Sequence, residues 1–353
     1  MTLEDHIKRR IATQGPMRLD EYMTTCLLHP TLGYYTTRRP FGQDGDFTTA
    51  PEISQMFGEL IGLALAQCWL DQGAPAPFTL AELGPGRGTL MADALRACAR
   101  VRGFVQAAQV VLVEASPALR GTQNQTLAPH PAHWVERCED LPDQPLFVIA
   151  NEFFDALPIR QFLRAGDQWC ERQVGLKDDR LIFGLAPALP KPMLNDRLAD
   201  TVDGDLIETS AGAAPVVSEL ARRISAHGGA ALIIDYGDWR TTGDSFQAVK
   251  AHQHADPLAD PGLADLTAHV DFEILAQAAA PCLHSRPTPQ GVFLERLGIT
   301  ARAQSLAKTL SAEALQNHIA AHRRLTHPQE MGNLFKVMGL YPPGQTAPPG
   351  VEP

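Results

Sequence analysis

The chain has 353 residues, of which 44% are hydrophobic and 20% are charged, a composition typical of folded globular proteins rather than disordered or fibrous ones. The formal net charge of −10, without a long Lys/Arg run, argues against a nucleic-acid-binding groove, because neutralising phosphates needs a concentrated basic face. Because a domain usually has roughly 100–200 residues, a chain of this length favours two units, or one large α/β unit with insertions.

Cysteine usage and the chain's first residues indicate the compartment. The six cysteines lie far apart and form no CxxC pair of the kind that holds zinc or a redox site, so we expect reduced thiols and no metal ion. The N-terminus lacks the apolar stretch of a signal peptide, and it carries early acids that a mitochondrial transit peptide avoids. No segment reaches roughly 18 uninterrupted apolar residues. We therefore expect a cytoplasmic prokaryotic enzyme or a mature organellar one, without stable membrane insertion.

The first 77 residues are predicted to form a helical extension. Helical patterns cover residues 3–13 and 19–23, separated by a Gly-Pro break, and residues 29–35 are typical of a loop. A polar, glycine-bearing segment at 42–51 leads into a helix over about 52–70. Its predicted apolar face comprises Met56, Leu60, Leu63 and Ala64.

From about residue 78 the pattern changes to short apolar runs that alternate with helices. The runs are 79–83, 110–114, 133–136 and 146–150, and a fifth, 230–236, follows a long interval with hairpin-like material and a Pro-rich linker. Continuous apolar runs joined by helices are typical of parallel strands with crossover connections. The sequence therefore predicts an α/β fold with a Rossmann-like sheet.

The last third of the chain is less regular. A short segment at 265–272 precedes a helix, residues 334–338 are typical of a final strand, and the Pro-rich end is expected to fray. The predicted organisation is an N-terminal helical extension at 1–77, a core at 78–240 with an insertion at about 160–213, a C-terminal part at 241–341, and a tail at 342–353.

The most informative motif is the glycine turn Glu82-Leu83-Gly84-Pro85-Gly86-Arg87-Gly88-Thr89, which follows a buried strand and precedes a helix. Glycines let a ligand lie against the backbone because no side chain blocks its approach. A dinucleotide fingerprint G-x-G-x-x-G would place its third glycine at position 89, but that residue is Thr89 and the glycine comes earlier, at Gly88. This spacing disfavours a nicotinamide-dependent oxidoreductase.

An acidic G-x-G-x-G turn is instead typical of a site for S-adenosylmethionine. In this interpretation Glu82 faces the cationic end of the cofactor, and Gly84, Gly86 and Gly88 admit its amino-acid moiety. Glu114, beside Ala115, ends the next strand, where a carboxylate can accept hydrogen bonds from both ribose hydroxyls. The alternative is a tight turn plus a surface glutamate. The cofactor interpretation is favoured because both acids fall at carboxyl ends of predicted parallel strands, where such sheets bind ligands.

The fourth predicted strand ends in Asn151-Glu152-Phe153-Phe154-Asp155-Ala156-Leu157-Pro158, which we expect to form the edge of the active site. Asn151 is expected to contribute to the cofactor site. If the methyl acceptor is a guanidinium, its pKa above about 12 keeps it protonated, so a carboxylate must orient it and help to remove a proton. Glu152 or Asp155 could do this. The alternative is that Asp155 caps the next helix and Glu152 is an ordinary surface acid.

Three further groups are candidates for the same cleft, each with a structural alternative. The polar segment before the 52–70 helix could close over a cofactor or bind substrate, or it could simply begin a helix. The end of the fifth strand could face the cleft or only terminate in a turn, and His269 could be a base or a structural histidine. The expected substrate-binding residues from these groups are Asp46, Thr48, Gln55, Asp235, Tyr236 and Asp271, with Thr49 and Glu52 on the same polar segment, and His269 joins the catalytic candidates.

Taken together, these motifs resemble the MidA-like family, whose mitochondrial member is the complex I assembly factor that methylates an arginine on a complex I subunit. The resemblance spans most of the chain. It is carried by the glycine turn, by 151–158, and by His29-Pro30-x-x-Gly33-Tyr34-Tyr35, residues 45–59, Asp235-Tyr236-Gly237 and His269-Val270-Asp271-Phe272.

The resemblance implies a class I methyltransferase fold with an N-terminal helical extension, S-adenosylmethionine as cofactor, and a protein arginine as acceptor. The expected partner is therefore a protein, such as a respiratory complex I subunit, and homodimer formation is left open. A second hypothesis keeps the same fold but not the chemistry. In it the chain is a non-catalytic assembly chaperone that offers a binding platform to a folding respiratory subunit.

Overall fold

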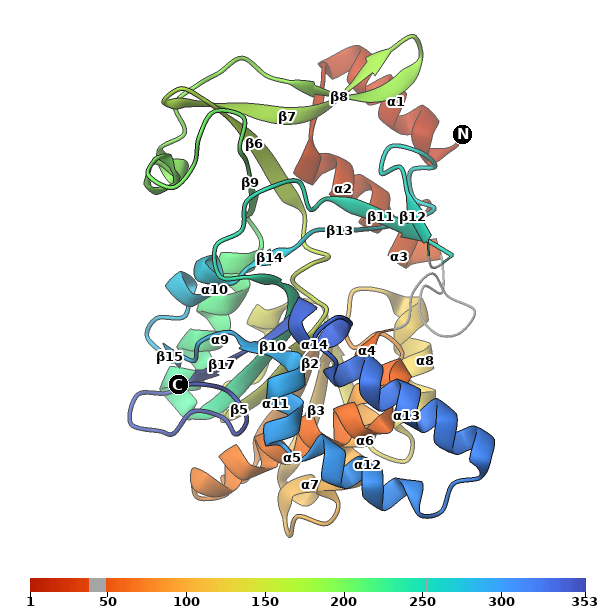
Figure 1. The fold of residues 1–353 in the computed structure, drawn as a ribbon, viewed down its shortest axis with the longest axis vertical. Helices are drawn as coiled ribbons and strands as arrows, with labels where there is room; N and C mark the ends of the chain where they lie inside the picture. Colours follow the sequence, from red (N-terminus) through yellow and green to blue (C-terminus); the bar gives the residue numbers. More distant parts are fainter. Residues whose placement is uncertain (38–48, 252) are drawn as a thin grey trace. The chain divides into compact units, whose positions relative to one another are not determined.

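The computed structural model describes residues 1–37, 49–251 and 253–353. The chain divides into two compact units, each built from three separate stretches (Figure 1). Unit 1 comprises Met1–Phe47, Asp155–Ala213 and Arg240–Asp271, and unit 2 comprises Thr48–Phe154, Ala214–Trp239 and Phe272–Pro353.

Unit 2 is built on a mixed sheet whose parallel part runs in the order β10-β5-β2-β3-β4. β17 pairs antiparallel with β10, and the short strands β15 and β16 pair antiparallel with β17. This arrangement confirms the predicted Rossmann-like sheet. The strands are β2 (Phe78–Leu83), β3 (Ala108–Val113), β4 (Ala132–Val135), β5 (Leu146–Asn151), β10 (Gly229–Asp238), β15 (Leu283–His284), β16 (Thr288–Pro289) and β17 (Phe335–Tyr341).

One face of this sheet packs against α5, α6, α11 and α12 (Figure 1). Alternate residues point to that face because side chains alternate along a strand; in β2 these are Phe78 and Leu80, and in β5 Phe147 and Ile149. The helices are α4 (Ala50–Ile53), α5 (Gln55–Asp71), α6 (Thr89–Cys98), α7 (Phe104–Ala107), α8 (Pro117–Leu127), η1 (Cys138–Asp140), α9 (Ala213–His227), α10 (Phe272–Ala278), α11 (Gln290–Arg296), α12 (Ile299–Ala307), α13 (Ala312–Thr326) and α14 (Met331–Leu334).

Unit 1 has its own hydrophobic core, which gathers all three of its stretches. Leu3, Ile7 and Tyr22 from the first stretch pack with Val174 from the second and Phe246 from the third. A sheet of order β1-β7-β6-β9, with β8 paired to β7, and a second sheet of order β12-β11-β13 frame this core. The elements are α1 (Leu3–Gln14), β1 (Met17–Arg18), α2 (Leu19–Leu28), α3 (Tyr34–Thr37), β6 (Ile159–Ala165), β7 (Gln168–Lys177), β8 (Arg180–Leu185), η2 (Pro192–Leu194), η3 (Asp196–Leu198), β9 (Leu206–Ser210), β11 (Gln247–Lys250), β12 (Gln253–Ala255), β13 (Asp265–Thr267) and β14 (Val270–Asp271).

These units divide the chain differently from the sequence-based organisation. The predicted 1–77 extension is split, because α4 and α5 pack on the unit 2 sheet while α1 and α2 bury their apolar side chains in the unit 1 core. The predicted insertion at 160–213 and residues 240–271 share that core. Local patterns give no sign of which distant segments share a core.

Two local predictions were wrong. The C-terminal tail does not fray: Val351 is buried, Pro348 packs against Gly339, and Glu352 N donates to Thr288 Oγ1 over 2.9 Å. On α5, Met56, Leu60 and Ala64 are buried as predicted, but Leu63 is 40% exposed.

All six cysteines, each in the described part of the chain, are free thiols, as predicted. No helix within the described residues is long and apolar enough to cross a membrane.

The contact between α5 and α6 depends on two glycines of α5. A Cβ built on Gly62 would lie 2.6 Å from Ala94 Cβ, and one built on Gly58 would lie 2.8 Å from Asp93 Cβ and from Leu90 O. Because the obstructing atoms belong to short or backbone groups, they have little freedom to move aside. The two helices can therefore approach this closely only with glycine at both positions.

We predict that Gly62→Val lowers the free energy of unfolding by about 1–3 kcal/mol, because the added side chain overpacks the α5–α6 contact. Chemical denaturation followed by circular dichroism would measure this. The matched control is Gly121→Ala at an exposed position of α8, where a new Cβ meets nothing within 4 Å and helix propensity alone predicts a gain of about 0.5–1 kcal/mol. Equal stability of Gly62→Val and the unmodified chain would contradict this packing argument.

Candidate functional site

The glycine turn lies where the strand order of the unit 2 sheet reverses direction. From β2 the chain proceeds to β3 and β4 on one side, and then to β5 and β10 on the other. The carboxyl ends of β2 and β5 are therefore adjacent, with Leu83 opposite Ala150 in the register. Open α/β sheets bind ligands in the crevice at such a switch point. The sequence-predicted groups at Glu82–Gly88 and Asn151–Glu152 thus meet at one edge of the sheet.

Left-handed backbone at three positions shapes the glycine turn. Gly84, Gly86 and Gly88 have φ of +60°, +52° and +83°, which side chains other than glycine rarely adopt. Gly88 N donates to Pro85 O over 2.7 Å, and Ala92 N donates to Gly88 O over 3.0 Å, so the turn passes directly into α6. The three predicted glycines are therefore required by conformation.

A short helix before α5 is tied to this turn. Thr89 Oγ1 donates to Glu52 Oε1 over 2.5 Å, and Arg87 Nη1 lies 3.6 Å from Glu52 Oε2. Glu52 belongs to α4, at the end of the polar segment singled out in the sequence. Its role in the structure is thus to attach α4 to the first residues of α6. Gln55, the first residue of α5, is exposed and donates to Glu59 Oε1 over 3.2 Å.

Glu82 is buried at the end of β2, where its charge is strongly disfavoured. Loss of water around the carboxylate raises the pKa of Glu82 to about 8, and a hydrogen bond from the backbone of Met91 opposes this only in part. Among the described residues Glu82 Oε2 has no hydrogen-bond partner. A buried carboxylate oxygen without a hydrogen-bond partner is suited to accept a proton, or to accept a hydrogen bond from a cationic ligand.

Glu114, which directly follows β3, is held by a residue that the sequence analysis did not single out. Ser116 N donates to Glu114 Oε1 over 2.7 Å, and Gln123 Nε2 donates to Glu114 Oε2 over 3.0 Å. Gln123 Nε2 also donates to Gly86 O over 2.8 Å. Burial raises the pKa of Glu114, and the bonds from Ser116 and Gln123 oppose the rise. A lone glutamine within a helix carries no sequence signal, so only the structure could identify it. Ala115, next along the chain, is exposed.

The end of β5 combines polar groups with a strained backbone. Glu152 has a φ of +51°, a conformation that costs a residue with a side chain on the order of 1 kcal/mol or more and that clusters at functional sites. Its Oε1 accepts from Ala50 N over 3.2 Å and from Asn151 Nδ2 over 3.1 Å. Phe153 packs over the glycine turn, since a Cβ on Gly84 would lie 3.0 Å from its ring. Hydrogen bonds from Ala50 and Asn151 therefore hold the Glu152 side chain in a defined position after β5.

The fifth predicted strand, β10, supports this edge through a buried acid. Asp235 is fully buried; Phe154 N donates to its Oδ2 over 2.9 Å and Tyr236 N to its Oδ1 over 3.0 Å. Tyr236 is 9% exposed, and its ring packs against Phe335 with centroids 5.5 Å apart. The Asp235 carboxylate thus orders the turn after β5. A direct contact of either residue with substrate stays a prediction.

The remaining predicted residues belong to unit 1 or lie outside the described residues, as Asp46 and Thr48 do. Asp155 is buried, and its backbone oxygen accepts from Ala268 N over 3.0 Å. His269 is half-buried, and its backbone N–H donates to Ser245 Oγ over 2.8 Å. Asp271 Oδ2 accepts from Thr241 N over 3.2 Å and lies 3.7 Å from Arg197 Nη1. Their catalytic and substrate-binding roles stay predictions.

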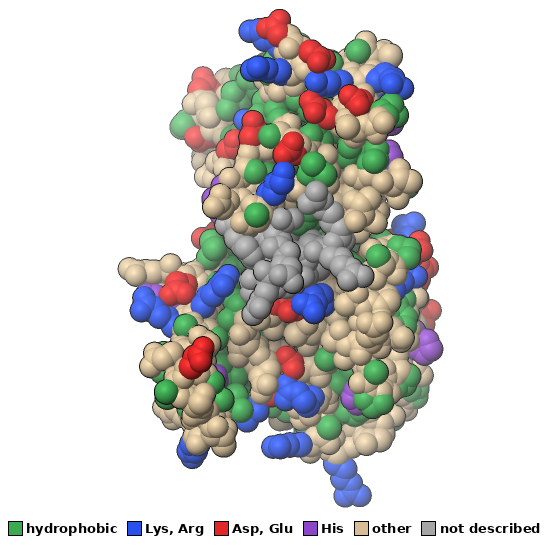
Figure 2. Space-filling model, turned by 90° about the vertical axis from the view of Figure 1, so that its right-hand side faces the viewer, with side chains coloured by type: hydrophobic (Ala, Val, Ile, Leu, Met, Phe, Trp, Pro, Cys, Tyr) green, Lys and Arg blue, Asp and Glu red, His purple; other side chains and the backbone are tan. Residues whose placement is uncertain are grey.

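The described surface residues mix both signs of charge. On the face drawn in Figure 2, Lys and Arg side chains are interspersed with Asp and Glu side chains and do not merge into one basic surface. This distribution agrees with the expectation, drawn from the net charge of −10, that the chain lacks a concentrated basic face for nucleic acid.

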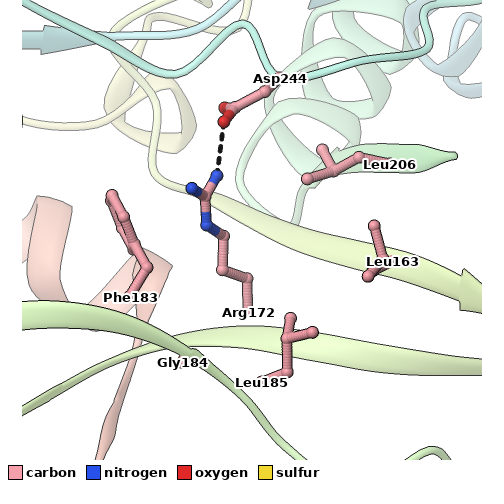
Figure 3. A pocket seen from close by; sticks show the side chains of 7 residues that line it. All are labelled: Leu163, Arg172, Phe183, Gly184, Leu185, Leu206 and Asp244. Carbon is pink, nitrogen blue, oxygen red and sulfur yellow. Dashed lines mark hydrogen bonds and ion pairs between the residues drawn. The ribbon is translucent and has the colours of Figure 1, made fainter. Parts of the chain in front are cut away.

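Unit 1 contains a cavity of about 280 Å³ that the sequence analysis did not anticipate (Figure 3). Its wall is mainly apolar and includes Leu163, Leu185 and Leu206. Arg172 points to Asp244, with 2.6 Å between Nη1 and Oδ2, and its guanidinium stacks 3.9 Å from the centre of the Phe183 ring. The charged groups among the described residues of this wall thus neutralise each other.

Comparison with known proteins relates this chain to methyltransferases. Residues 60–287 match the family described as "Putative S-adenosyl-L-methionine-dependent methyltransferase". The chain is 36% identical, over 96% of its length and 84% of the relative's, to the mitochondrial protein arginine methyltransferase NDUFAF7 of Xenopus laevis. It is 34% identical to the human protein of that name, over 96% of this chain and 82% of the relative.

A solved structure has the same fold. It is a crystal structure from Burkholderia thailandensis bound to S-adenosyl-homocysteine, with a TM-score of 0.83 and 28% sequence identity, covering 96% of this chain and 91% of that one.

The raised pKa of Glu82 predicts how stability depends on pH. The folded chain holds the Glu82 proton up to about pH 8, whereas the unfolded chain releases it near 4.5, the ordinary pKa of a glutamate. The group's stabilising contribution is therefore full below pH 4.5 and is lost progressively until pH 8, by on the order of 1 kcal/mol per pH unit.

We expect Glu82→Gln to remove this slope, so that its stability relative to the unmodified chain increases from pH 5 to pH 8. Urea unfolding at several pH values, without added ligand, would measure the difference. Parallel stability curves for the two proteins would show that Glu82 is ionised throughout this range.

Proposed function

Because the chain belongs to the family of S-adenosylmethionine-dependent methyltransferases, we propose that it methylates an arginine of a protein substrate. The observation that carries the proposal is the meeting of the glycine turn, Glu114 and Glu152 at the switch point of the sheet. The relatives that match over nearly the whole chain are named protein arginine methyltransferases, and these names support arginine as the methyl acceptor.

The residues at this edge fit S-adenosylmethionine. Gly84, Gly86 and Gly88 carry no side chain to block the backbone at these positions, so an amino-acid moiety can approach it there. The buried oxygen of Glu82, for which the described residues supply no donor, suits the cationic end of the cofactor. Glu114, oriented by two hydrogen bonds, suits a ribose diol. Asn151 Oδ1 is a further buried acceptor without a partner among the described residues.

The chemistry assigns a task to Glu152. When bound, the cofactor supplies an electrophilic methyl group on a sulfonium. A guanidinium is a poor nucleophile while it is protonated, and its pKa lies above about 12. A fixed carboxylate can orient the guanidinium, localise its charge and receive its proton, and alignment of the reacting atoms supplies much of the acceleration. Glu152, held in a strained conformation, is our first candidate for this task, with Asp155 and His269 of unit 1 as the others.

The substrate is a protein, and we infer a subunit of respiratory complex I from the resemblance to the MidA-like family. In a prokaryote this reaction would take place in the cytoplasm. A non-catalytic assembly chaperone remains the second candidate, because a preserved cofactor fold can also serve as a binding platform. Mass spectrometry of respiratory subunits from cells with and without this gene would identify the methylated arginine, and an unchanged methylation pattern would favour the chaperone.

We predict that Glu152→Gln lowers the rate of methyl transfer by about 100-fold or more, the range typical of losing a positioned acid–base group. Glutamine keeps the acceptor for Ala50 N and the shape of the side chain, so the affinity for S-adenosylhomocysteine should change by less than about threefold. Transfer of labelled methyl to extracts from cells lacking the gene would measure the rate, and calorimetry would measure the affinity.

A matched control is Glu313→Gln, which removes an exposed carboxylate of α13 and should change neither quantity. Full activity of Glu152→Gln would remove Glu152 from the catalytic candidates. If the unmodified chain gave no heat with S-adenosylhomocysteine, the methyltransferase proposal itself would fail.

A further inference from the structure

Gln123 is a fully buried polar side chain that joins three parts of the candidate cofactor site. It projects from α8 and is 0% exposed. Its Nε2 donates to Gly86 O over 2.8 Å and to Glu114 Oε2 over 3.0 Å. Its Oε1 accepts from Trp134 Nε1 over 2.7 Å. The side chain also contacts the third glycine, because a Cβ on Gly88 would lie 3.6 Å from Gln123 Cγ.

The chemistry of these neighbours fixes the orientation of the amide. The indole of Trp134 can only donate, so it must face the amide oxygen. The NH₂ group then faces a carbonyl and a carboxylate, which can only accept while the carboxylate is ionised. Flipping the amide would place two donors together and an oxygen against two acceptors. Gln123 therefore has one orientation in which each of its polar atoms is satisfied.

We propose that Gln123 is a positioning residue for S-adenosylmethionine, which couples the glycine turn to Glu114 and so sets recognition of the cofactor's ribose. This inference rests on the proposed function and adds to it a residue that contacts the binding groups rather than the reacting atoms. One NH₂ group fixes the backbone that receives the amino-acid moiety and the carboxylate that receives the ribose. Binding of the amino-acid moiety at the glycine turn should therefore favour binding of the ribose at Glu114, and the reverse.

The same contact favours the ionised form of Glu114. Burial raises the pKa of Glu114, and the hydrogen bond from Gln123 opposes the rise because it stabilises the charged form. An ionised carboxylate accepts stronger hydrogen bonds from hydroxyl groups than a neutral one does. Loss of Gln123 should therefore weaken selection of a ribose over a deoxyribose, in addition to any general loss of affinity.

The test compares Gln123→Met with the unmodified protein in calorimetric titrations with S-adenosylhomocysteine and with its 2′-deoxyadenosyl analogue. Methionine has a similar length but donates no hydrogen bond. We expect affinity for S-adenosylhomocysteine to fall by about tenfold to a hundredfold, the range typical of removing a residue that orients the binding groups without touching the ligand. We also expect the preference for the ribose form to shrink, whereas a purely structural defect would weaken both ligands equally and leave that preference unchanged.

A second variant isolates the donor side of the amide. Gln123→Glu keeps an acceptor for Trp134 but places a second carboxylate against Glu114. Because the two acids would share a proton at lower pH, the affinity of this variant relative to that of the unmodified protein should rise between pH 8.5 and 6.5. Titration of Glu82 in the same pH range affects both proteins alike and cancels in this ratio. Gln290→Glu is the matched control, since Gln290 is equally buried and donates to Leu325 O, outside the cofactor site.

The outcomes separate the two proposals. If the unmodified chain binds S-adenosylhomocysteine while Gln123→Met keeps its affinity and its preference for ribose, the positioning role is refuted and the proposed function stands. If the unmodified chain does not bind, the proposed function fails first. If Gln290→Glu reproduces the pH response of Gln123→Glu, the response is not specific to this contact and the coupling is refuted.

Discussion

Burial of the Glu82 carboxyl at the end of a parallel strand is the constraint on which the site depends. A charged group in this place is costly unless it gains a proton or a partner, and its pKa of about 8 expresses that cost. The backbone of Met91, which donates a hydrogen bond to this carboxyl, belongs to α6. The carboxyl therefore connects the strand before the glycine turn with the helix after it, and the turn between them has to reverse the chain within a few residues. Only glycines in left-handed conformations do this without strain.

Around this turn, each neighbouring element contributes one contact that fixes the next. Thr89 donates a hydrogen bond to Glu52 and thereby holds α4. The backbone N–H of Ala50 in α4 donates to Glu152, and Asp235 accepts from the backbone of the turn that follows Glu152. On the other side Gln123 connects the turn with Glu114. The candidate site is thus a connected network of polar contacts. Removing one member should affect its neighbours because buried polar groups left without a partner are costly.

The two units have separate cores, and this separates two kinds of candidate residues. Those proposed to hold the cofactor, together with Glu152, belong to unit 2, where the sheet places them. Asp155, His269 and Asp271 belong to unit 1. The backbone of Asp155 bonds Ala268, the backbone of His269 bonds the Ser245 hydroxyl, and the Asp271 carboxylate lies near Arg197. Unit 1 also carries the apolar cavity with its neutralised Arg172–Asp244 pair. The proposed roles of Asp155, His269 and Asp271 in catalysis and substrate binding stay predictions.

The sequence by itself determined the type of sheet, the cofactor and the glycine turn. Alternation of apolar runs with helices is a local pattern, and the conformational demand on Gly84, Gly86 and Gly88 is also local, so both can be predicted without coordinates. The sequence also placed Glu114, Asn151 and Glu152 at strand ends, because an acid or amide after an apolar run is visible along the chain.

Only the tertiary structure decided which segments share a core and which side chains complete the site. The joining of residues 1–47 with 155–213 and 240–271, the return of the tail onto Gly339, and the contacts of Gln123 all depend on residues distant in sequence. The positive φ of Glu152 was equally invisible, since nothing local requires it. Packing and buried hydrogen bonds are chosen among partners across the whole chain, and a pattern within one segment records only that segment's own periodicity.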